Sequence, residues 1–209
     1  MGGHGYWERL VQDVVRIEPG ERVLDLGCGP ARVIDHLPSG VVYTGLDRNG
    51  RCVRQARRRY GDMASFIESD AAALHELTGE FDVIFAMGLL HHLSDPDACA
   101  MLSGAARLLV PGGRLMTADA VSTPQALPSA AWLLARDRGD YVRDVSGYRR
   151  LIAGSFKDID LTLAMDLLRV PLTGAPFPLL IAMASVASRP RFVDAVEARP
   201  GRQPALAHG

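Results

Sequence analysis

The chain has 209 residues, which is enough to bury one sizeable hydrophobic core and too few to favour two full domains. Lys and Arg total 23 and Asp and Glu total 24, so the formal net charge of -1 creates no long-range field that would attract nucleic acid or an anionic membrane. We therefore expect a small-molecule ligand, and neither nucleic acid nor a membrane as a partner.

Cysteine usage and the apolar segments indicate where such a protein works. Cys28, Cys52 and Cys99 show no CxxC spacing, which argues against a disulfide framework and a structural zinc site. The opening MGGHGYWERL lacks the features of a secretion signal, and the apolar stretches at 83–90 and 179–187 are under half of the roughly 20 residues that cross a bilayer. The expectation is a cytoplasmic monomer or homodimer that holds no metal.

The predicted elements alternate between helices and strands up to about residue 118. Residues 1–20 are expected to form a helical lid segment before the main domain, which we place at 21–188. Apolar runs with helices between them predict strands at 22–26, 41–46, 65–69, 81–87 and 113–118. The clearest helix spans about 96–109, with Asp95 as its cap and Pro96 in its first turn. This order is typical of a parallel sheet with helices on both faces.

The second half of the chain follows a different order. Residues 122–156 predict two helices around a charged turn, which indicates a helical insertion at about 120–150. Residues 158–170 and 179–187 are separated only by a proline-punctuated loop, so they predict two strands that are joined directly and run antiparallel. Three prolines and weak periodicity predict a flexible tail at 189–209.

A glycine-rich loop follows the first predicted strand in the segment VLDLGCGPAR, residues 23–32. Open parallel sheets bind ligands at this end of their strands, and Gly27 and Gly29 would let ligand atoms approach backbone N–H groups. A dinucleotide fingerprint GxGxxG would have glycine where Arg32 stands, so binding of NAD is disfavoured. Asp25 precedes the loop, where a carboxylate suits an ammonium or hydroxyl group and would repel a pyrophosphate.

Two more acids stand at the ends of predicted strands. Asp47 comes 20 residues after Gly27, where a carboxylate can accept both hydroxyls of a ribose. Asp70 closes SFIESD, where it can accept from an adenine amine while the neighbouring Ala71 N–H meets a ring nitrogen. Three acids at three strand ends suit an adenosine with a cationic or zwitterionic tail. As alternatives, Asp25 would cap a helix, the other two would be solvated loop acids, and the glycines would form only a tight turn.

Five segments in order resemble the successive motifs of class I S-adenosylmethionine-dependent methyltransferases of the small-molecule type: VLDLGCGPAR, YTGLD, ESDAAAL, FDVIFAMGLLHHL and LLVPGGRLMTAD. The resemblance covers roughly residues 20–120. It implies a Rossmann-like α/β fold, in which an open sheet of seven strands is mostly parallel with an antiparallel last strand and has helices on both faces. One departure is Ala31, where the family often has a third glycine.

The same resemblance implies a site for S-adenosylmethionine, with S-adenosylhomocysteine as product. Its glycine loop would lie beside the methionine part, residues 47–48 at the ribose, residues 70–71 at the adenine, and the backbone around 86–87 along the sulfonium side. The cofactor-binding residues predicted in this way, together with Asp25, are Gly27, Cys28, Gly29, Asp47, Arg48, Asp70, Ala71, Ala86 and Met87. Cys28 has a simpler alternative as a small packing residue.

Residues near the fourth strand and outside the shared motifs are candidates for the chemistry and for acceptor binding. His91 and His92 are the candidate general bases. The alternative is that the pair has no such role, since adjacent side chains at the start of a helix usually diverge. The candidate acceptor-binding residues are Tyr6, Trp7, Tyr141, Arg143 and Tyr148, and Trp132 is considered beside them. The aromatic rings among them can stack on a planar acceptor. Helix packing explains Tyr148 and Trp132 equally well.

The leading hypothesis is an enzyme that transfers a methyl group to a small-molecule acceptor, by in-line displacement in a cleft at the carboxyl ends of the strands. A non-catalytic nucleoside-binding or interaction protein on the same fold is one alternative, and a methyltransferase acting on an RNA base is another. The arginine-rich segment 51–62 is expected to be the solvated face of a helix whose Val53, Ala56 and Tyr60 point inward. O-, N- and C-methylation all stay open.

Overall fold

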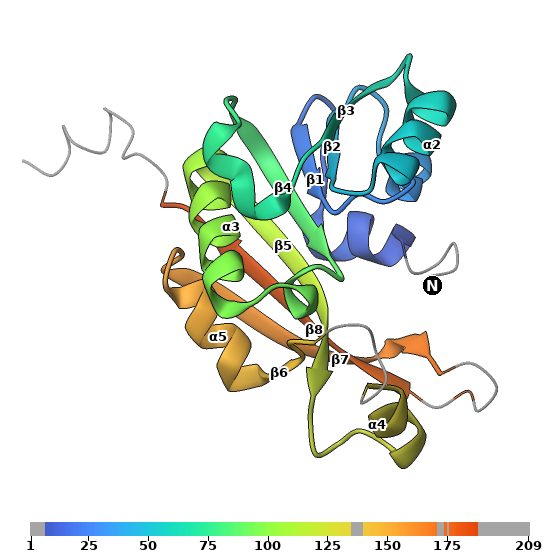
Figure 1. The fold of residues 1–209 in the computed structure, drawn as a ribbon, viewed down its shortest axis with the longest axis vertical. Coiled ribbons are helices and arrows are strands. Elements are labelled where there is room, and N and C mark those ends of the chain that lie inside the picture. Colours follow the sequence, from blue (N-terminus) through green and yellow to red (C-terminus); the bar gives the residue numbers. More distant parts are fainter. Residues whose placement is uncertain (1–6, 135–139, 171–173, 175, 188–209) are drawn as a thin grey trace, which may run out of the picture.

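The structure is a computed structural model that describes residues 7–134, 140–170, 174 and 176–187. Tyr6, residues 135–139 of the charged turn and the tail predicted at 189–209 lie outside these described residues. The described chain forms a central sheet with helices on its two faces (Figure 1).

The sheet has seven main strands, named in chain order: β1 (Arg22–Leu26), β2 (Val42–Asp47), β3 (Ala64–Glu68), β4 (Phe81–Met87), β5 (Leu109–Ser122), β7 (Asp158–Arg169) and β8 (Pro176–Ser185). Their spatial order is β3-β2-β1-β4-β5-β8-β7; β1 to β5 are parallel, and β8 runs antiparallel to both β5 and β7. A two-residue strand, β6 (Arg143–Asp144), pairs with the end of β5 and brings the sheet to eight strands. The predicted fold with a reversed last strand is confirmed, with one short strand more than expected.

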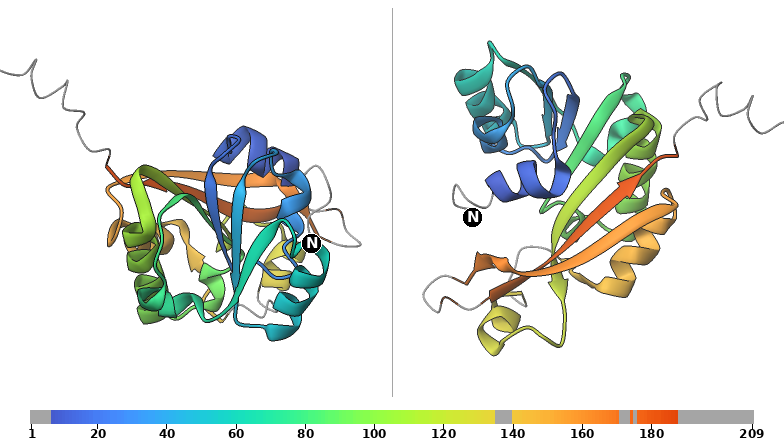
Figure 2. Two further views of the ribbon diagram at one scale, coloured as in Figure 1. Left: turned by 90° about the horizontal axis from the view of Figure 1, so that it is seen from above. Right: turned by 180° about the vertical axis from the view of Figure 1, so that it is seen from behind.

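One face of the sheet is covered by the helices that follow β3, β4 and β6. Ile84 and Ala86 of β4 lie in a core cluster with residues of α3 (Asp95–Leu108), α5 (Val145–Ala153) and the 3-10 helix η3 (Ala71–Glu76). The views of Figures 1 and 2 show α3 and α5 side by side on this face. The predicted helix at 96–109 is α3, although Ser94 rather than Asp95 caps it, because the Ser94 Oγ accepts the Asp97 N–H.

The other face carries the N-terminal segment and the arginine-rich helix. Val83 and Phe85 of β4 lie in a second core cluster with residues of the π-helix η1 (Arg9–Val15), α2 (Gly50–Tyr60) and α4 (Pro128–Leu134). Alternate residues of β4 thus face opposite helical layers, which explains its unbroken apolar sequence. η1 lies within the stretch predicted as a helical lid segment and packs against the sheet.

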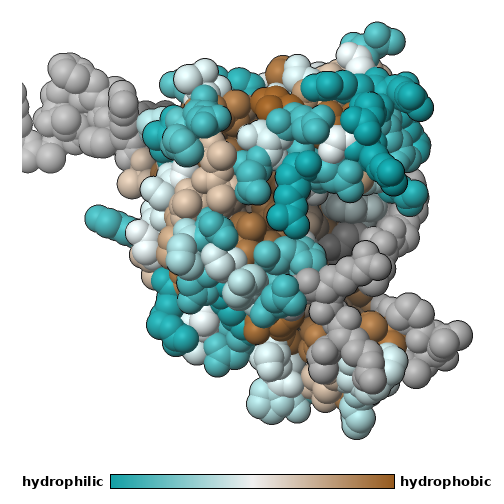
Figure 3. Space-filling model, in the orientation of Figure 1, coloured by the Kyte–Doolittle hydropathy of each residue, from teal (hydrophilic) through white to brown (hydrophobic). Residues whose placement is uncertain are grey.

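The arginine-rich helix has the predicted orientation. Val53, Ala56 and Tyr60 are the buried residues of α2, and Asn49 caps its first turn by accepting the Arg51 N–H. The arginines of α2 are exposed, and Figure 3 shows hydrophilic residues gathered over this helix. Three of them fall in the last turn, where positive charge is favourable because of the helix dipole.

Two connections are shorter than the sequence predicts. The segment after β1 forms only the 3-10 helix η2 (Arg32–His36), and the segment after β3 forms only η3. Leu37 ends η2 with extended backbone (ψ 147°), because the residue before a proline avoids the helical region and Pro38 follows. After β5 the two predicted helices are present as α4 and α5.

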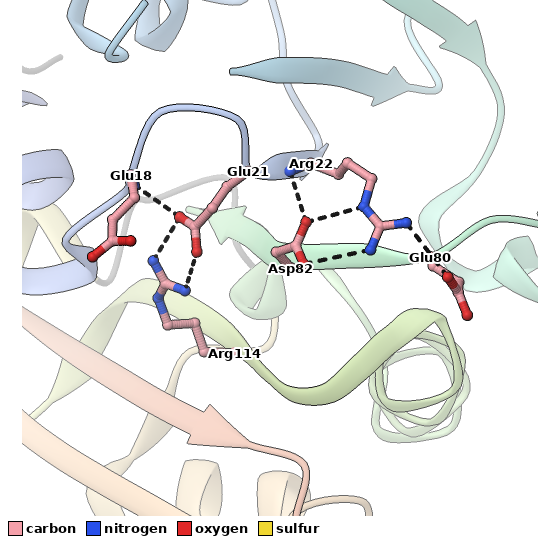
Figure 4. A network of polar contacts seen from close by, with 6 residues as sticks. All are labelled: Glu18, Glu21, Arg22, Glu80, Asp82 and Arg114. Atoms are coloured by element: carbon pink, nitrogen blue, oxygen red, sulfur yellow. Dashed lines mark hydrogen bonds and ion pairs between the residues drawn. The ribbon is translucent and has the colours of Figure 1, made fainter. Parts of the chain in front are cut away.

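An arginine on β5 ties the N-terminal segment to the sheet (Figure 4). The Arg114 guanidinium donates to the carbonyl oxygens of Val15 and Arg16, at the end of η1, and forms a two-oxygen ion pair with Glu21 (2.8 and 2.9 Å). A neighbouring pair, Arg22 with Asp82, joins the starts of β1 and β4. The end of η1 is therefore fixed to β5.

Candidate active site

A cavity of about 480 Å³ lies where the carboxyl ends of β1, β2, β3 and β4 meet. It is within the size range of small-molecule sites. Five of the predicted cofactor-binding residues line it: Gly27, Asp47, Arg48, Asp70 and Ala71. The structure therefore brings residues of four predicted motifs to one cavity, because Gly88 and His92 of the fourth motif also line it, as does Cys52.

The glycine loop has a backbone that favours glycine. Gly27 and Gly29 have φ angles of 73° and 53°, in the left-handed region that side chains with a Cβ rarely adopt. A Cβ at Gly27 would also come within 3.3 Å of the Leu89 side chain. Ala31, at the departure from the family pattern, keeps a left-handed backbone with φ 55° and is fully buried. The alanine thus adopts the conformation that a third glycine would have.

Asp47 is the carboxylate most closely connected with this loop. Its Oδ2 accepts the Gly29 N–H (2.8 Å) and its Oδ1 accepts the Asn49 N–H (2.7 Å). The side chain is half-buried and lines the cavity. Each carboxylate oxygen has a second lone pair, so the group can hold the loop and still accept hydrogen bonds from a ligand.

Asp70 also lines the cavity, and it has a structural partner as well. Its carboxylate accepts the Ala72 N–H (2.9 Å) and caps η3, while the residue itself is exposed. A capping oxygen with a spare lone pair remains able to accept from a ligand.

Asp25 lies behind the glycine loop and is not among the residues that line the cavity. It is only 5% exposed and accepts the Tyr43 hydroxyl hydrogen bond at 2.6 Å. Burial raises the pKa of this carboxyl from 3.8 to about 6; the Tyr43 hydrogen bond opposes the rise, and the negative charge of Asp47 adds to it. Ionisable groups with shifted pKa values are common at functional sites.

Cys28 is buried within the loop, and it does not line the cavity. Burial, followed by the charges of Asp25 and Asp47, raises the pKa of its thiol well above the usual value. A thiolate is therefore disfavoured there, which supports the packing alternative.

A second cavity of about 370 Å³ adjoins the first, and the two share Gly88 and His92. Its walls are largely apolar, and the polar side chains there belong to the two histidines and to Trp7. The apolar walls are formed by Met87, Ala118, Ala120, Leu133, Leu168, Phe177 and Leu179. Of the predicted residues, Met87, Trp7, His91 and His92 line it; Ala86 is buried in β4 and lines neither cavity.

His91 has a carboxylate partner that the sequence analysis did not single out. Its ring Nδ1 lies 2.8 Å from the Asp119 Oδ1, and its backbone N–H donates to the same oxygen. Both residues are buried, at 7% and 1% exposure. An ionised carboxylate can only accept hydrogen bonds, so this contact favours the ring tautomer that carries its proton on Nδ1. The one sequence signal is that Asp119 ends the motif LLVPGGRLMTAD.

The other predicted acceptor-binding residues lie elsewhere. Tyr141, Arg143 and Tyr148 line neither of the two cavities. Tyr148 is 1% exposed, and its hydroxyl donates to the Ala120 carbonyl, which supports the packing alternative. Arg143 binds backbone carbonyls, and Tyr141 is 43% exposed. Tyr6 is outside the described residues, and Trp132 is exposed on α4.

Comparison with known proteins assigns this architecture to a family. Residues 23–113 match the family model described as a methyltransferase domain. Residues 23–113 therefore form a methyltransferase domain, and the fold around them is that of class I S-adenosylmethionine-dependent methyltransferases. The matched region contains the glycine loop, the ends of β2, β3 and β4, and both histidines. The cofactor of this class is S-adenosylmethionine.

Relatives of the methyltransferase domain include two named bacterial proteins. The chain is 32% identical over 142 residues to 27-O-demethylrifamycin SV methyltransferase of Amycolatopsis mediterranei, covering 58% of this chain and 52% of the relative. It is 36% identical over 132 residues to demethylmenaquinone methyltransferase of Beutenbergia cavernae, covering 63% and 53%. The chain thus spans about half the length of the curated relatives it matches.

A solved structure shares the fold. Phosphoethanolamine N-methyltransferase 2 of Haemonchus contortus, in complex with S-adenosyl-L-methionine, aligns with a TM-score of 0.70 at 15% identity, covering 89% of this chain and 53% of that one. Among the described residues, no helix is long and apolar enough to cross a membrane. The same residues contain no group of three or more His, Cys, Asp and Glu side chains placed to hold a metal ion.

Proposed function

We propose that the methyltransferase domain transfers a methyl group from S-adenosylmethionine to a small, largely apolar acceptor. The observation that carries this proposal is the pair of adjoining cavities that share Gly88 and His92. A polar cavity with two carboxylates suits a nucleoside, and an apolar cavity beside it suits the acceptor. The shared wall is then the place where the methyl group passes between them.

The residues of the first cavity fit the cofactor. In this proposal Asp47 accepts the ribose hydroxyls, and Asp70 with the Ala71 N–H meets the adenine; that all three line the cavity supports these roles. Arg48 and Cys52 line the same wall. Gly27 and Gly29 let the methionine part approach the loop, and the buried Asp25 carboxylate provides negative charge behind it for the ammonium group.

The residues of the second cavity determine which acceptors fit. Its volume of about 370 Å³ is at the lower end of the range for small-molecule sites. Trp7 and Phe177 provide aromatic surface, and Ala118 and Ala120 leave room at the sheet. An apolar acceptor with one proton-bearing group near His91 would match this wall. The names of the two bacterial relatives, which act on a demethylrifamycin and a demethylmenaquinone, support an acceptor of this kind.

The chain contributes alignment and removal of a proton. S-adenosylmethionine would supply a methyl group that is bonded to a positively charged sulfur. The sulfur would keep the electron pair of the carbon–sulfur bond as the acceptor forms its new bond to the methyl carbon. Holding the acceptor in line can be worth about 7 to 11 kcal/mol. In this proposal His91, which lines the second cavity, takes the proton that the acceptor loses, and Asp119 beside its Nδ1 stabilises the positive ring that results. Three cysteines, all free, support a reducing cytoplasmic setting.

Turnover with labelled cofactor tests the proposal directly. The purified chain is expected to bind S-adenosylhomocysteine and not NAD in calorimetry, and to transfer labelled methyl groups to members of a panel of hydroxylated apolar molecules. Binding of S-adenosylhomocysteine without methyl transfer to any acceptor, whether in the panel, in bacterial metabolite extracts or in RNA, would support a non-catalytic nucleoside-binding protein. Transfer to RNA in place of small molecules would contradict the acceptor assignment.

Asp47→Ala is expected to lower the affinity for S-adenosylhomocysteine by about 5- to 150-fold, which corresponds to about 1 to 3 kcal/mol for unpaired polar groups. The variant removes both acceptors and also frees the Gly29 N–H, so a ligand comparison is needed. A 2′,3′-dideoxy analogue lacks the hydroxyls, and against it the penalty of the substitution should largely disappear. An equal penalty for both ligands would assign Asp47 to loop structure alone. Asp62→Asn, at an exposed carboxyl beyond α2, is the control.

A further inference from the structure

The Arg143 guanidinium contacts the turn that carries the two histidines. One terminal nitrogen donates to the carbonyl oxygens of Leu90 (2.8 Å) and Tyr141 (3.0 Å). The other donates to the Leu93 carbonyl (2.8 Å) and to Asp95 (2.6 Å), which the Nε also contacts. The side chain is only 11% exposed, although Asp95 is 72% exposed. The bonds to the Leu90 and Leu93 carbonyls are part-buried, whereas those to Tyr141 and Asp95 are exposed.

The carbonyls that Arg143 binds stand on either side of the histidine pair. Leu90 begins the 3-10 helix η4 (Leu90–His92), and Leu93 is its last cap residue. The Tyr141 N–H donates to the His91 carbonyl (3.1 Å), so residues 141–143 bind three carbonyls of this one turn. A three-residue 3-10 helix has few hydrogen bonds of its own, so its geometry depends on such external partners.

The same arginine is anchored to the strand that carries Asp119. Arg143 opens β6 and pairs with Val121 of β5, two residues beyond Asp119. Its guanidinium lies 5.8 Å from the ring centroid of Tyr148, whose hydroxyl donates to the Ala120 carbonyl. Arg143 therefore contacts the turn that carries His91, and it also pairs with β5 just beyond Asp119.

We propose that Arg143 is a positioning residue that holds the Leu90–Leu93 turn against β5 and so keeps His91 aligned with Asp119 at the acceptor cavity. The inference rests on the proposed function, because alignment of His91 matters only if the cavity holds a methyl acceptor. It replaces direct acceptor binding as the role of Arg143, whose donors face carbonyls and Asp95 instead of either cavity. Lysine cannot substitute fully, because a single ammonium lacks the planar fork that spans Leu90, Leu93 and Asp95.

Three variants separate positioning from charge and from folding. Arg143→Ala removes every contact of the guanidinium. Arg143→Lys keeps the positive charge and loses the fork, and it serves as the test variant if the alanine variant does not fold. Asp95→Asn is the matched control, because it removes the exposed ion pair and leaves the bonds to the Leu90 and Leu93 carbonyls in place.

The first measurement does not depend on turnover. In NMR spectra of labelled protein, the His91 Nδ1–H that is bonded to Asp119 is expected to be protected from exchange in wild type and in Asp95→Asn, and to be lost in Arg143→Ala. Retention of this signal in Arg143→Ala would overturn the proposal. If the wild-type chain methylates no acceptor, the proposed function fails, while this comparison still decides whether Arg143 holds the turn.

The second measurement uses kinetics. Arg143→Ala is expected to lower kcat by about 10- to 100-fold, since a displacement near 1 Å can cost that much, with the KM for the acceptor and the Kd for S-adenosylhomocysteine changed less than threefold. Methylguanidinium should restore part of kcat to Arg143→Ala and none to a His91→Ala control. Wild-type kcat in Arg143→Ala, or a loss of cofactor affinity and thermal stability in proportion to kcat with no rescue, would contradict a positioning role.

Discussion

His91→Ala is expected to lower turnover by about 100- to 10,000-fold, the range for loss of a general base, while the affinity for S-adenosylhomocysteine changes little. His91 lines the acceptor cavity and not the cofactor cavity, so its removal should affect kcat rather than cofactor binding. His75→Ala is the control, because His75 is an exposed histidine on η3 that lines neither of the two cavities.

Asp119 gives a second test of the same assignment. Asp119→Asn keeps an oxygen for the backbone N–H and the ring Nδ1–H of His91, and it removes the negative charge that would stabilise the protonated ring. Its kcat is expected to fall in the same direction as that of His91→Ala. Because the two residues act as a unit, the double variant should be no slower than the slower single variant. Additive losses would indicate separate roles.

The sequence predicts those parts of the fold and site that depend on local signals. The apolar runs give β1 to β5 within a few residues, because a strand covered on both faces is apolar throughout. Gly27 and Gly29 are also visible in sequence, since their left-handed φ angles require a residue without a side chain. Asp47 and Asp70 follow from their places at strand ends, and the structure puts both at one cavity.

The contacts that the sequence analysis missed join residues far apart in the chain. Asp119 is 28 residues from His91 and on the neighbouring strand, so only the pairing of β4 with β5 shows that they meet. Arg143 lies on β6, and its part-buried bonds go to backbone carbonyls, which leave no trace in residue identity. Tyr148 has an aromatic ring that could stack on an acceptor, but it lies on the buried side of α5 and packs in the core.

Asp25→Asn is the second variant with a large expected effect, and it should stabilise the folded protein at neutral pH. Burial raises the pKa of the Asp25 carboxyl from 3.8 to about 6, against the opposing hydrogen bond from Tyr43. At about 1.4 kcal/mol for each pKa unit, the buried charge costs about 3 kcal/mol. Asparagine keeps an oxygen for the Tyr43 hydroxyl and carries no charge.

The direction of this change in stability depends on whether the folded or the unfolded state binds the Asp25 proton more tightly. The folded state holds the Asp25 proton more tightly than the unfolded state, so the stability from this group is fully present below pH 3.8 and is lost as the pH rises through about 6. Asp25→Asn should therefore match wild type in acid and exceed it by about 1 to 3 kcal/mol at about pH 8. Urea denaturation at several pH values measures this difference, with Asp62→Asn as an exposed control.

Cofactor binding should change in the opposite direction. If the Asp25 charge serves the ammonium group of the cofactor, Asp25→Asn becomes more stable and binds S-adenosylhomocysteine less tightly, a trade-off that is common at functional sites. Binding would also require an ionised carboxylate, so wild-type affinity should fall by about tenfold for each pH unit below the pKa of about 6, and the variant should show no such fall. A difference in unfolding free energy between the two proteins that does not change with pH would contradict the raised pKa of Asp25. Equal and pH-independent affinities for S-adenosylhomocysteine would contradict only the role of the Asp25 charge in binding.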